Sequence, residues 1–287
     1  MKLQQTLSKE ITASGIGLHS GKYISMKILP APDDHGISFK RIDLSESVLI
    51  SANVHNVGKT SLGTTLGEVG FSVATVEHLL ASFIGLEIDN AIVEIDEEEI
   101  PIFDGSAATM VYLIENAGVL EQKKPRKYLK VLQKVEVQEE DKYASLEPYD
   151  GYRINLELSF NHPAVDKENS FYSYEFSRES FISEIANART FGFLKDIEYL
   201  RKKKLTLGGS VDNAIVLDEK EIINIDGLRY PNEFSRHKVL DVLGDLFLIG
   251  APIIGSFHGK KSGHGLNINL AKKLLSNKEN YTWICID

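Results

Sequence analysis

The sequence predicts an α+β protein with two domains, each containing a sheet that is covered by helices on one face. Its 287 residues are about twice the length of an average domain. Each half reads as several short strands with one or two helices. The strands are joined by hairpin-like turns, without the regular alternation of strand and helix that is typical of parallel sheets. A hydrophobic fraction of 43% and a charged fraction of 25% indicate a full core, which excludes disorder as the main state.

A short polar and basic segment separates the two halves. EQKKPRK (121–127) is interrupted by Pro125, follows a predicted helix, and precedes alternating strand-like sequence from Tyr128. We therefore expect a domain boundary in this segment. The expected divisions are a first domain over residues 1–121, a linker over residues 122–127 and a second domain over residues 128–287.

Five helices are predicted from apolar residues at helical spacing and from the residues that flank them. Glycine follows two of these helices, at Gly85 and Gly250, where the chain readily leaves the helical conformation. The five helices are expected over residues 75–84, 106–116, 177–188, 232–249 and 270–276.

A weak internal repeat also favours two domains. DNAIVEIDEEEIPIFDG begins at Asp89, and DNAIVLDEKEIINIDG begins at Asp212. Both read as an apolar strand, an acidic turn, a second apolar stretch and Asp-Gly before a helix. Strand-turn-strand sequence is common, so coincidence is the alternative, but five identical residues followed by the same pattern favour duplication.

Charge and cysteine content limit the environment and the partners. The net charge is −9, which opposes binding along nucleic acid phosphates, and the single Cys285 excludes an intrachain disulfide. No apolar run approaches the roughly 18 residues of a spanning helix, and the first residues lack the apolar core of a signal peptide. We expect a cytoplasmic monomer. RKKK (201–204) suggests anionic lipid or nucleic acid binding, although such a run in an acidic protein is more often a solvated surface.

The helix predicted over residues 232–249 carries an unexpected polar stripe. His237, Asp241 and Asp245 follow one another at four-residue spacing among apolar residues that cover most of the helix. Carboxylates are seldom buried unless they are paired or bind a cation. A histidine and an aspartate four residues apart can reach one ion, and this ligand set suits Zn²⁺. The alternative is a solvated stripe whose aspartates face neighbouring basic residues.

Two further histidines are candidates for the same site. His78 lies near the start of another helix and directly follows Glu77. A histidine ligand beside a glutamate fits zinc hydrolases, in which the carboxylate removes a proton from water. Glu77 can equally be an ordinary acid in a first helical turn. His264 is flanked by Gly263 and Gly265, which leaves room for a ligand, although a turn histidine is the simpler interpretation.

Seven short blocks follow one another along the chain. They are IGLHSG (16–21), TVEHLL (75–80), IPIFDGS (100–106), ARTFGF (188–193), LGGS (207–210), GLRYPNEFSRHKVLDVLGDL (227–246) and KSGHGLN (261–267). Together, over residues 6–269, they resemble the zinc-dependent UDP-3-O-acyl-N-acetylglucosamine deacetylases, which catalyse the committed step of lipid A biosynthesis in Gram-negative bacteria. Seven ordered blocks are far more specific than any one of them.

The resemblance implies two α+β domains of similar topology with the active site in the cleft between them. His78 from the first domain and His237 and Asp241 from the second would hold Zn²⁺. An inserted segment, residues 191–216, would form an apolar passage for a fatty acyl chain. The implied reaction hydrolyses the N-acetyl group of a UDP-3-O-(3-hydroxyacyl)-N-acetylglucosamine and releases acetate and the free amine.

The resemblance also implies the roles of individual residues. Glu77 would be the general base, and Thr190 would help the metal to stabilise the oxyanion. His264, held by Asp245, would be cationic and would protonate the leaving amine. The residues implied in substrate binding are Lys238 and Lys261 for the diphosphate, Phe160 for the uracil, and Phe191, Phe193, Ile197, Val211 and Val216 for the acyl chain.

One position departs from the family, because Gly63 stands where several members carry a cysteine close to the metal. Metal affinity or inhibition by excess zinc is therefore in doubt, although the catalytic set is complete without a cysteine. Two other classes stay open. A zinc peptidase would use the same water chemistry, but the order Glu77-His78 is the reverse of an H-E-x-x-H motif. A sugar-nucleotide or lipid-binding module with a structural metal would need four protein ligands.

Overall fold

The computed structural model describes residues 1–46, 48–159, 162–165 and 171–286. The chain is α+β, as predicted, and contains two five-stranded arrangements of the same topology. In the first sheet a central strand pairs antiparallel with one neighbour and parallel with the other, and the two outer pairs are antiparallel. The strands, in spatial order, are β2 (Ile11–Ile16), β3 (Tyr23–Pro30), β9 (Ala91–Ile95), β4 (Ile37–Arg41) and β5 (Leu49–Ser51).

The second sheet repeats this order and these directions around β18. Two further strands extend it beside the start of β18, where β11 runs parallel to β18 and antiparallel to β19. Its strands are β12 (Val135–Glu139), β13 (Lys142–Glu147), β18 (Ile253–Lys260), β14 (Tyr152–Glu157), β15 (Phe171–Glu175), β11 (Lys127–Val131) and β19 (Tyr281–Cys285).

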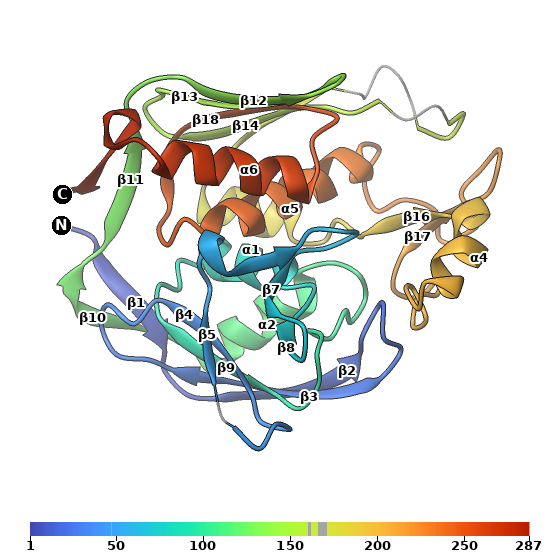
Figure 1. Cartoon of the computed structure of the whole chain (residues 1–287), viewed down its shortest axis with the longest axis horizontal. Coiled ribbons are helices and arrows are strands. Elements are labelled where there is room, and N and C mark those ends of the chain that lie inside the picture. The colour runs from blue at the N-terminus through green and yellow to red at the C-terminus, as the bar shows by residue number, and fades with distance from the viewer. Residues whose placement is uncertain (47, 160–161, 166–170, 287) are drawn as a thin grey trace.

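Four helices lie between the two sheets (Figure 1). In each half of the chain the order is helix, central strand, helix, so α1–β9–α2 corresponds to α5–β18–α6. These helices are α1 (Glu77–Gly85), α2 (Ala108–Ala117), α5 (Glu233–Phe247) and α6 (His264–Leu275). The largest hydrophobic cluster contains residues of both sheets and of all four helices, so one continuous core joins the two halves.

The two central helices, α1 and α5, are in close contact. Every residue of α1 is buried. A Cβ atom at Gly244 of α5 would lie 2.0 Å from the carbonyl oxygen of Glu77, so only glycine permits this approach of the two backbones. The first turn of α1 is therefore held against the middle of α5.

Each half also carries an insertion. The first contains a three-stranded sheet, and the second contains a parallel strand pair with a helix between its strands. Figure 1 shows that the second insertion projects from the layered body. The inserted elements are β6 (Val57–Lys59), β7 (Thr65–Glu68) and β8 (Phe71–Val73) in the first half, and β16 (Phe191–Phe193), α4 (Leu194–Lys202) and β17 (Ile215–Leu217) in the second.

Several local predictions need correction. Helix α4 was not predicted, and α6 begins at His264, earlier than the expected residue 270. Glycine at position 265 weakens the helical signal there, but Leu266 and Asn267 are buried, so packing overrides propensity. The region expected as one helix over residues 177–188 is a short α3 (Arg178–Ser180) continued by a π-helical turn, η3 (Phe181–Ile185).

The segment expected to be a linker is largely a strand. Residues 119–125 form β10 (Val119–Pro125), which pairs antiparallel with β1 (Leu3–Leu7). The position of a domain boundary there stays a prediction. The described residues contain no helix that combines the length and apolar character needed to cross a bilayer.

The internal repeat does not mark corresponding elements. Its first copy contains β9, the central strand of the first sheet, whereas its second contains β17, which pairs with β16 in the insertion. The counterpart of β9 is β18. The residues that the two copies share have similar local preferences for strand and turn. The two strands differ in the strands they pair with, and those partners lie far away in the sequence.

Candidate active site

The candidate site lies where α1, α5 and α6 meet between the two sheets. Glu77 and His78 occupy the first turn of α1, and the stripe on α5 faces them from the other half of the chain. The stripe is buried, so its interpretation as a solvated helix face is wrong. The polar residues that converge are Glu77, His78, His237, Asp241, Asp245 and His264.

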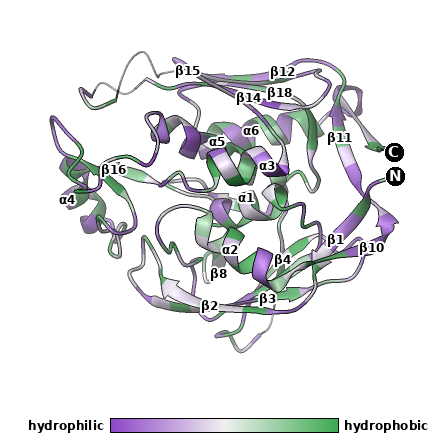
Figure 2. Ribbon diagram, turned by 180° about the vertical axis from the view of Figure 1, so that it is seen from behind, coloured by the Kyte–Doolittle hydropathy of each residue, from purple (hydrophilic) through white to green (hydrophobic). Residues whose placement is uncertain are grey.

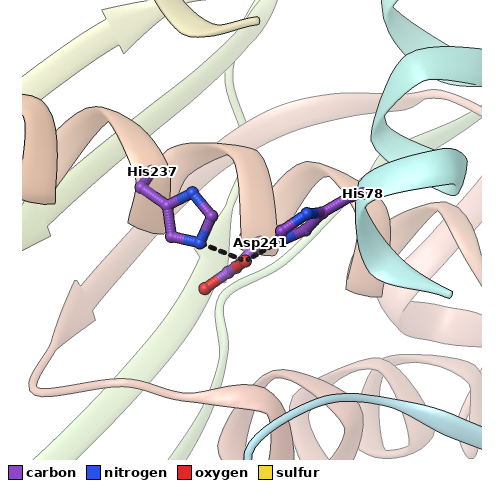
Figure 3. A group of neighbouring side chains, drawn as sticks. All are labelled: His78, His237 and Asp241. Carbon is purple, nitrogen blue, oxygen red and sulfur yellow. Dashed lines mark ion pairs between the residues drawn. The ribbon is translucent and has the colours of Figure 1, made fainter. Parts of the chain in front are cut away.

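Three of these residues form a cluster that could hold a metal ion (Figure 3). The Nε2 atoms of His78 and His237 lie 3.7 Å and 3.4 Å from Oδ1 of Asp241. One ligand atom from each residue lies within 4.8 Å of the other two. All three residues are buried, and two of them come from α5 and one from α1. A cation held here would therefore tie the two halves together.

The protonation of the cluster suits metal binding. Burial lowers the pKa of His237 to about 3, so its imidazole is neutral, and its Nδ1 lies 3.0 Å from the carbonyl oxygen of Ala188. That contact makes Nδ1 the donor and leaves Nε2 free to bind a cation. Burial alone would raise the pKa of Asp241, but Lys238 and His237 outweigh this effect and hold it well below its usual range.

The other ring nitrogen of His78 has no protein partner in the described part of the chain. Nδ1 of His78 is buried and has no hydrogen-bond partner among the described residues. Buried polar atoms without partners are rare and call for an explanation such as a bound ion or water. The donor set of two imidazoles and one ionised carboxylate fits a divalent cation of the Zn²⁺ type, with open positions left for other ligands.

His264 is oriented by a buried aspartate. Asp245 is fully buried and accepts three hydrogen bonds, from Nδ1 of His264 at 2.9 Å, from Oγ1 of Thr64 at 2.6 Å and from Nδ2 of Asn267 at 2.9 Å. Burial alone would lower the pKa of His264, but Asp245 and Glu77 outweigh it and raise this pKa to about 10. His264 is therefore a cation at neutral pH, and its Nε2 lies 4.0 Å from Oε1 of Glu77.

Glu77 is a buried carboxyl at the edge of the metal cluster. Its Oε2 accepts a hydrogen bond of 2.9 Å from the backbone N–H of Thr64. Burial raises the pKa of Glu77, and the cationic His264 opposes that shift. A Cβ atom at Gly63 would lie 3.0 Å from Oε1 of Glu77, so the position that departs from the family faces this carboxylate.

A cavity of about 360 Å³ opens onto these groups. Thr190, Phe191, Lys238 and Lys261 line it, as the resemblance leads one to expect. Lys238 donates a hydrogen bond of 2.7 Å to Oδ2 of Asp241, and Lys261 forms an ion pair with Asp141. Phe160 lies outside the described residues.

A smaller, mostly apolar cavity of about 210 Å³ adjoins the first one. The two cavities share Leu18, Thr190 and Phe191 in their walls, so they are neighbours. The second cavity lies under the insertion formed by β16, α4 and β17. All five residues implied in acyl binding line it, namely Phe191, Phe193, Ile197, Val211 and Val216.

A buried ion pair fixes the segment before β16 to the start of α5. Arg189 donates to Glu233, the first residue of α5, through Nε at 2.8 Å and through its backbone N–H at 3.0 Å. Arg189 stands between Ala188, which contacts the ring of His237, and Thr190, which lines both cavities. The pair therefore sets the position of both neighbours relative to α5.

Sequence reasoning missed several polar residues of the site, among them Thr64, Asn267, Lys142 and Glu139. Thr64 and Asn267 hold Asp245, and Lys142 and Glu139 line the larger cavity. Asn267 was within a recognised block, KSGHGLN, which is the only signal that pointed to it. No spacing in the sequence indicates that residues near 64 and 142 approach α5.

The chain is similar to known proteins over almost its whole length. Residues 4–276 match the family model described as UDP-3-O-acyl N-acetylglycosamine deacetylase. A Xanthomonas axonopodis pv. citri protein named UDP-3-O-acyl-N-acetylglucosamine deacetylase is 47% identical over 284 residues, covering 99% of this chain and 94% of that protein. A Methylococcus capsulatus protein of the same name is 48% identical over 284 residues, covering 99% of this chain and 93% of that protein. The chain belongs to the UDP-3-O-acyl-N-acetylglucosamine deacetylase family.

Proposed function

We propose that this protein is a zinc-dependent amidohydrolase. Its substrate is a UDP-3-O-(3-hydroxyacyl)-N-acetylglucosamine, its products are acetate and the free amine, and the reaction is the committed step of lipid A biosynthesis. The observation that carries the proposal is the buried cluster of His78, His237 and Asp241, with Glu77 and His264 beside it and an apolar cavity adjoining it. Membership of the deacetylase family supports the choice of reaction.

The three clustered residues would hold Zn²⁺. When bound there, zinc supplies a Lewis acid that polarises the acetamide carbonyl and lowers the pKa of water. Lys238 keeps Asp241 ionised without occupying Oδ1, the oxygen that faces both histidines. A carboxylate with one oxygen paired and one free is arranged to bind a cation without losing its internal partner.

Glu77 acts as the general base. It takes a proton from the water that attacks the acetamide carbon, so that a C–O bond forms as the carbonyl oxygen gains negative charge. The Thr190 hydroxyl, at the wall of the same cavity, donates to that oxygen. Thr64 holds Glu77 through its backbone N–H, and this bond fixes the direction of the carboxylate.

His264 acts as the general acid. The C–N bond breaks as its imidazolium transfers a proton to the amine nitrogen. The contact with Asp245 makes Nδ1 the permanent donor, so Nε2, on the side of Glu77, carries the proton that is transferred. Base and acid therefore lie side by side at the wall of the cavity that would receive the acetamide.

The two cavities would bind different parts of the substrate. Lys238 and Lys261 line the larger one and would meet the diphosphate, for which Lys261 exchanges its contact with Asp141. The apolar cavity would receive the acyl chain, and each buried methylene contributes about 0.8 kcal/mol to binding. Phe160 stays a proposed contact for the uracil.

The direct test is product analysis with purified, zinc-loaded protein. Acetate and the free amine should appear from the O-acylated sugar nucleotide, and both should cease after zinc is removed by a chelator and return when it is restored. N-acetylated peptides serve as the comparison substrate. Hydrolysis of the peptides alone would assign the site to a peptidase, and metal binding without hydrolysis of either substrate would leave only a binding protein.

A further inference from the structure

The insertion in the second half forms an exposed arm, here residues 191–225, which contains β16, α4 and β17. Figure 2 shows hydrophilic and hydrophobic residues side by side on it. No residue of α4 is buried. Of the 20 large hydrophobic side chains that are exposed in the described residues, the arm carries six, although it holds about an eighth of the chain. They are Leu194, Tyr199, Leu207, Val211, Ile223 and Ile225.

The arm as a whole carries six basic and six acidic residues and is neutral, but one segment of it is basic. Residues 194–204 contain five lysines and arginines and two acidic residues, a net charge of +3, whereas the whole chain has a net charge of −9. Lys202, Lys203 and Lys204 are exposed, and none of them forms an ion pair with a described residue. The run that was expected to be an ordinary solvated surface therefore lies among exposed apolar side chains.

Aromatic and basic groups are in contact on this surface. Tyr199 is 58% exposed, and Nζ of Lys203, one helical turn later, lies 4.5 Å from the centre of its ring. Lys202 is on the same side of α4, at three-residue spacing from Tyr199. We call Tyr199, Lys202, Lys203, Lys204 and Leu207 the arm patch.

An anionic lipid surface fits the arm patch better than other partners. An amphipathic helix with lysines beside aromatic and aliphatic groups binds at the interface of anionic bilayers, where each lysine adds attraction and the apolar groups enter the headgroup region. Nucleic acid offers phosphates but no apolar layer for Leu207.

The position of the arm adds a second argument. Leu194, Val211 and Ile223 are exposed and also line the apolar cavity of about 210 Å³. The same short segment therefore carries the outer wall of the cavity and the basic patch. A bilayer that touched the patch would lie beside this wall, where an amphiphile can pass between the lipid and the cavity.

We propose that the arm patch docks the protein on an anionic phospholipid bilayer. Docking itself rests only on the arm. Its use in delivering an acylated substrate or releasing an acylated product rests on the proposed function. The electrostatic part of the attraction is screened by salt, so binding should be reversible and sensitive to ionic strength.

The test is co-sedimentation of the zinc-loaded protein with vesicles. Vesicles of phosphatidylglycerol mixed with phosphatidylcholine should bind the protein at low salt and release it at high salt, and vesicles of phosphatidylcholine alone should bind it weakly. Absence of binding to the anionic vesicles would overturn the proposal, as would equal binding to both compositions.

Matched variants locate the contact. Lys202→Gln, Lys203→Gln and Lys204→Gln combined remove three charges that each contribute about fivefold, so partitioning onto anionic vesicles should fall by about 100-fold. Lys9→Gln, Lys123→Gln and Lys278→Gln combined make the same change in net charge at exposed sites elsewhere and should change partitioning little. Tyr199→Ser should weaken it several-fold. Equal losses in both triple variants would reject the arm as the contact.

Activity without vesicles separates this proposal from the proposed function. Neither triple variant touches a residue assigned to the metal cluster or to the acyl cavity, so both should hydrolyse dispersed substrate at the rate of the unchanged protein. Hydrolysis without vesicle binding would refute docking and leave the deacetylase. Vesicle binding without hydrolysis would refute the deacetylase and leave docking.

Discussion

The two halves of the molecule share one topology but contribute differently to the site. Each half places a helix before its central strand and another after it. Of these two helices in the first half only α1 contributes, through Glu77 and His78 in its first turn, and α2 supplies no residue to either of the two cavities. In the second half the middle of α5 and the start of α6 both contribute. A repeated scaffold has thus been used asymmetrically, and a helix terminus from one copy meets a helix centre from the other.

The insertions differ in the same way. The first half inserts a small sheet, from whose strand-connecting segment Thr64 holds Glu77 and Asp245. The second half inserts the arm, whose apolar inner wall forms a cavity and whose residues 194–204 carry a net charge of +3. One insertion therefore orders catalytic groups, and the other provides space and a surface. The two insertions differ in topology as well as in side chains, so the topology that the two halves share does not account for the difference.

Removing a metal ligand from either half should have the largest effect. His78→Ala, His237→Ala and Asp241→Ala should each weaken zinc retention at least about tenfold and abolish turnover, because a three-residue site loses a third of its protein ligands. Zinc content after dialysis, measured by elemental analysis, checks this. His55→Ala, which changes an exposed histidine outside the cluster, is the control. Full zinc content in all three variants would show that the two halves do not share a metal.

Changing Glu77 should separate chemistry from metal binding. Glu77→Ala and the isosteric Glu77→Gln should keep their zinc, since Glu77 is outside the ligand cluster, and should lose about 10²–10⁴-fold in kcat. Zinc content and single-turnover rates on the same preparations provide the comparison. A variant that loses metal together with rate, or one that keeps nearly full activity, contradicts the role of Glu77 as base.

Each half of the molecule should contribute the group that sets one limb of the profile of rate against pH. Glu77 must be ionised, and burial raises its pKa, so the rate should rise with pH above the usual glutamate range. His264 must be protonated, and although burial opposes it, Asp245 and Glu77 raise its pKa to about 10, so the rate should fall as pH increases through that value. A bound cation lowers both pKa values and moves both limbs toward lower pH without exchanging them.

His264→Gln tests this assignment. It should keep zinc, lose up to about 10²–10⁴-fold in rate and flatten the alkaline limb of kcat/KM, while the acidic limb persists. Asp245→Asn should displace the alkaline limb downward, because it removes the nearest negative charge from His264. If the alkaline limb of His264→Gln is unchanged, that limb belongs to another group and the acid lies elsewhere.

The arm should determine the preference for an acylated substrate. The O-acylated sugar nucleotide should be turned over at least about 100-fold more efficiently than its non-acylated analogue, since several methylenes at about 0.8 kcal/mol each exceed the required difference. Ile197→Gln places an amide in the cavity wall and should reduce this ratio. Ile225→Gln, on an exposed residue of the same arm that does not line the cavity, should leave it unchanged. Equal efficiency on both substrates would reject an acyl cavity.

The sequence predicted those site residues that lie close together on one helix or that belong to a recognisable block. His237 and Asp241 were predicted because one helix presents them at four-residue spacing, and the α+β class followed from strand and turn patterns. His78, beside Glu77 in α1, was a candidate for this site from the sequence alone, but its assignment as a metal ligand came from the family resemblance. Thr64 lies in a loop and Lys142 is the first residue of β13. Both were missed because no periodicity in the sequence indicates that these two segments approach the site. The order of the strands could not be predicted either, because β9 lies between β3 and β4 and pairs with residues that are distant in the sequence.

The smallest expected effect concerns the contact that joins the two halves. Gly244→Ala places a methyl group 2.0 Å from the carbonyl oxygen of Glu77, so α1 and α5 must separate. Overpacking of this kind costs about 1–3 kcal/mol, and the free energy of unfolding in urea should fall by that amount. Because His78 and Asp241 lie on the separated helices, zinc affinity should fall as well. Gly192→Ala, where an added methyl group meets no atom within 4 Å, should leave zinc affinity unchanged. A Gly244→Ala protein that is destabilised but binds zinc as tightly as before would show that the metal cluster tolerates this separation, and the fixed packing of α1 on α5 would then matter for stability alone.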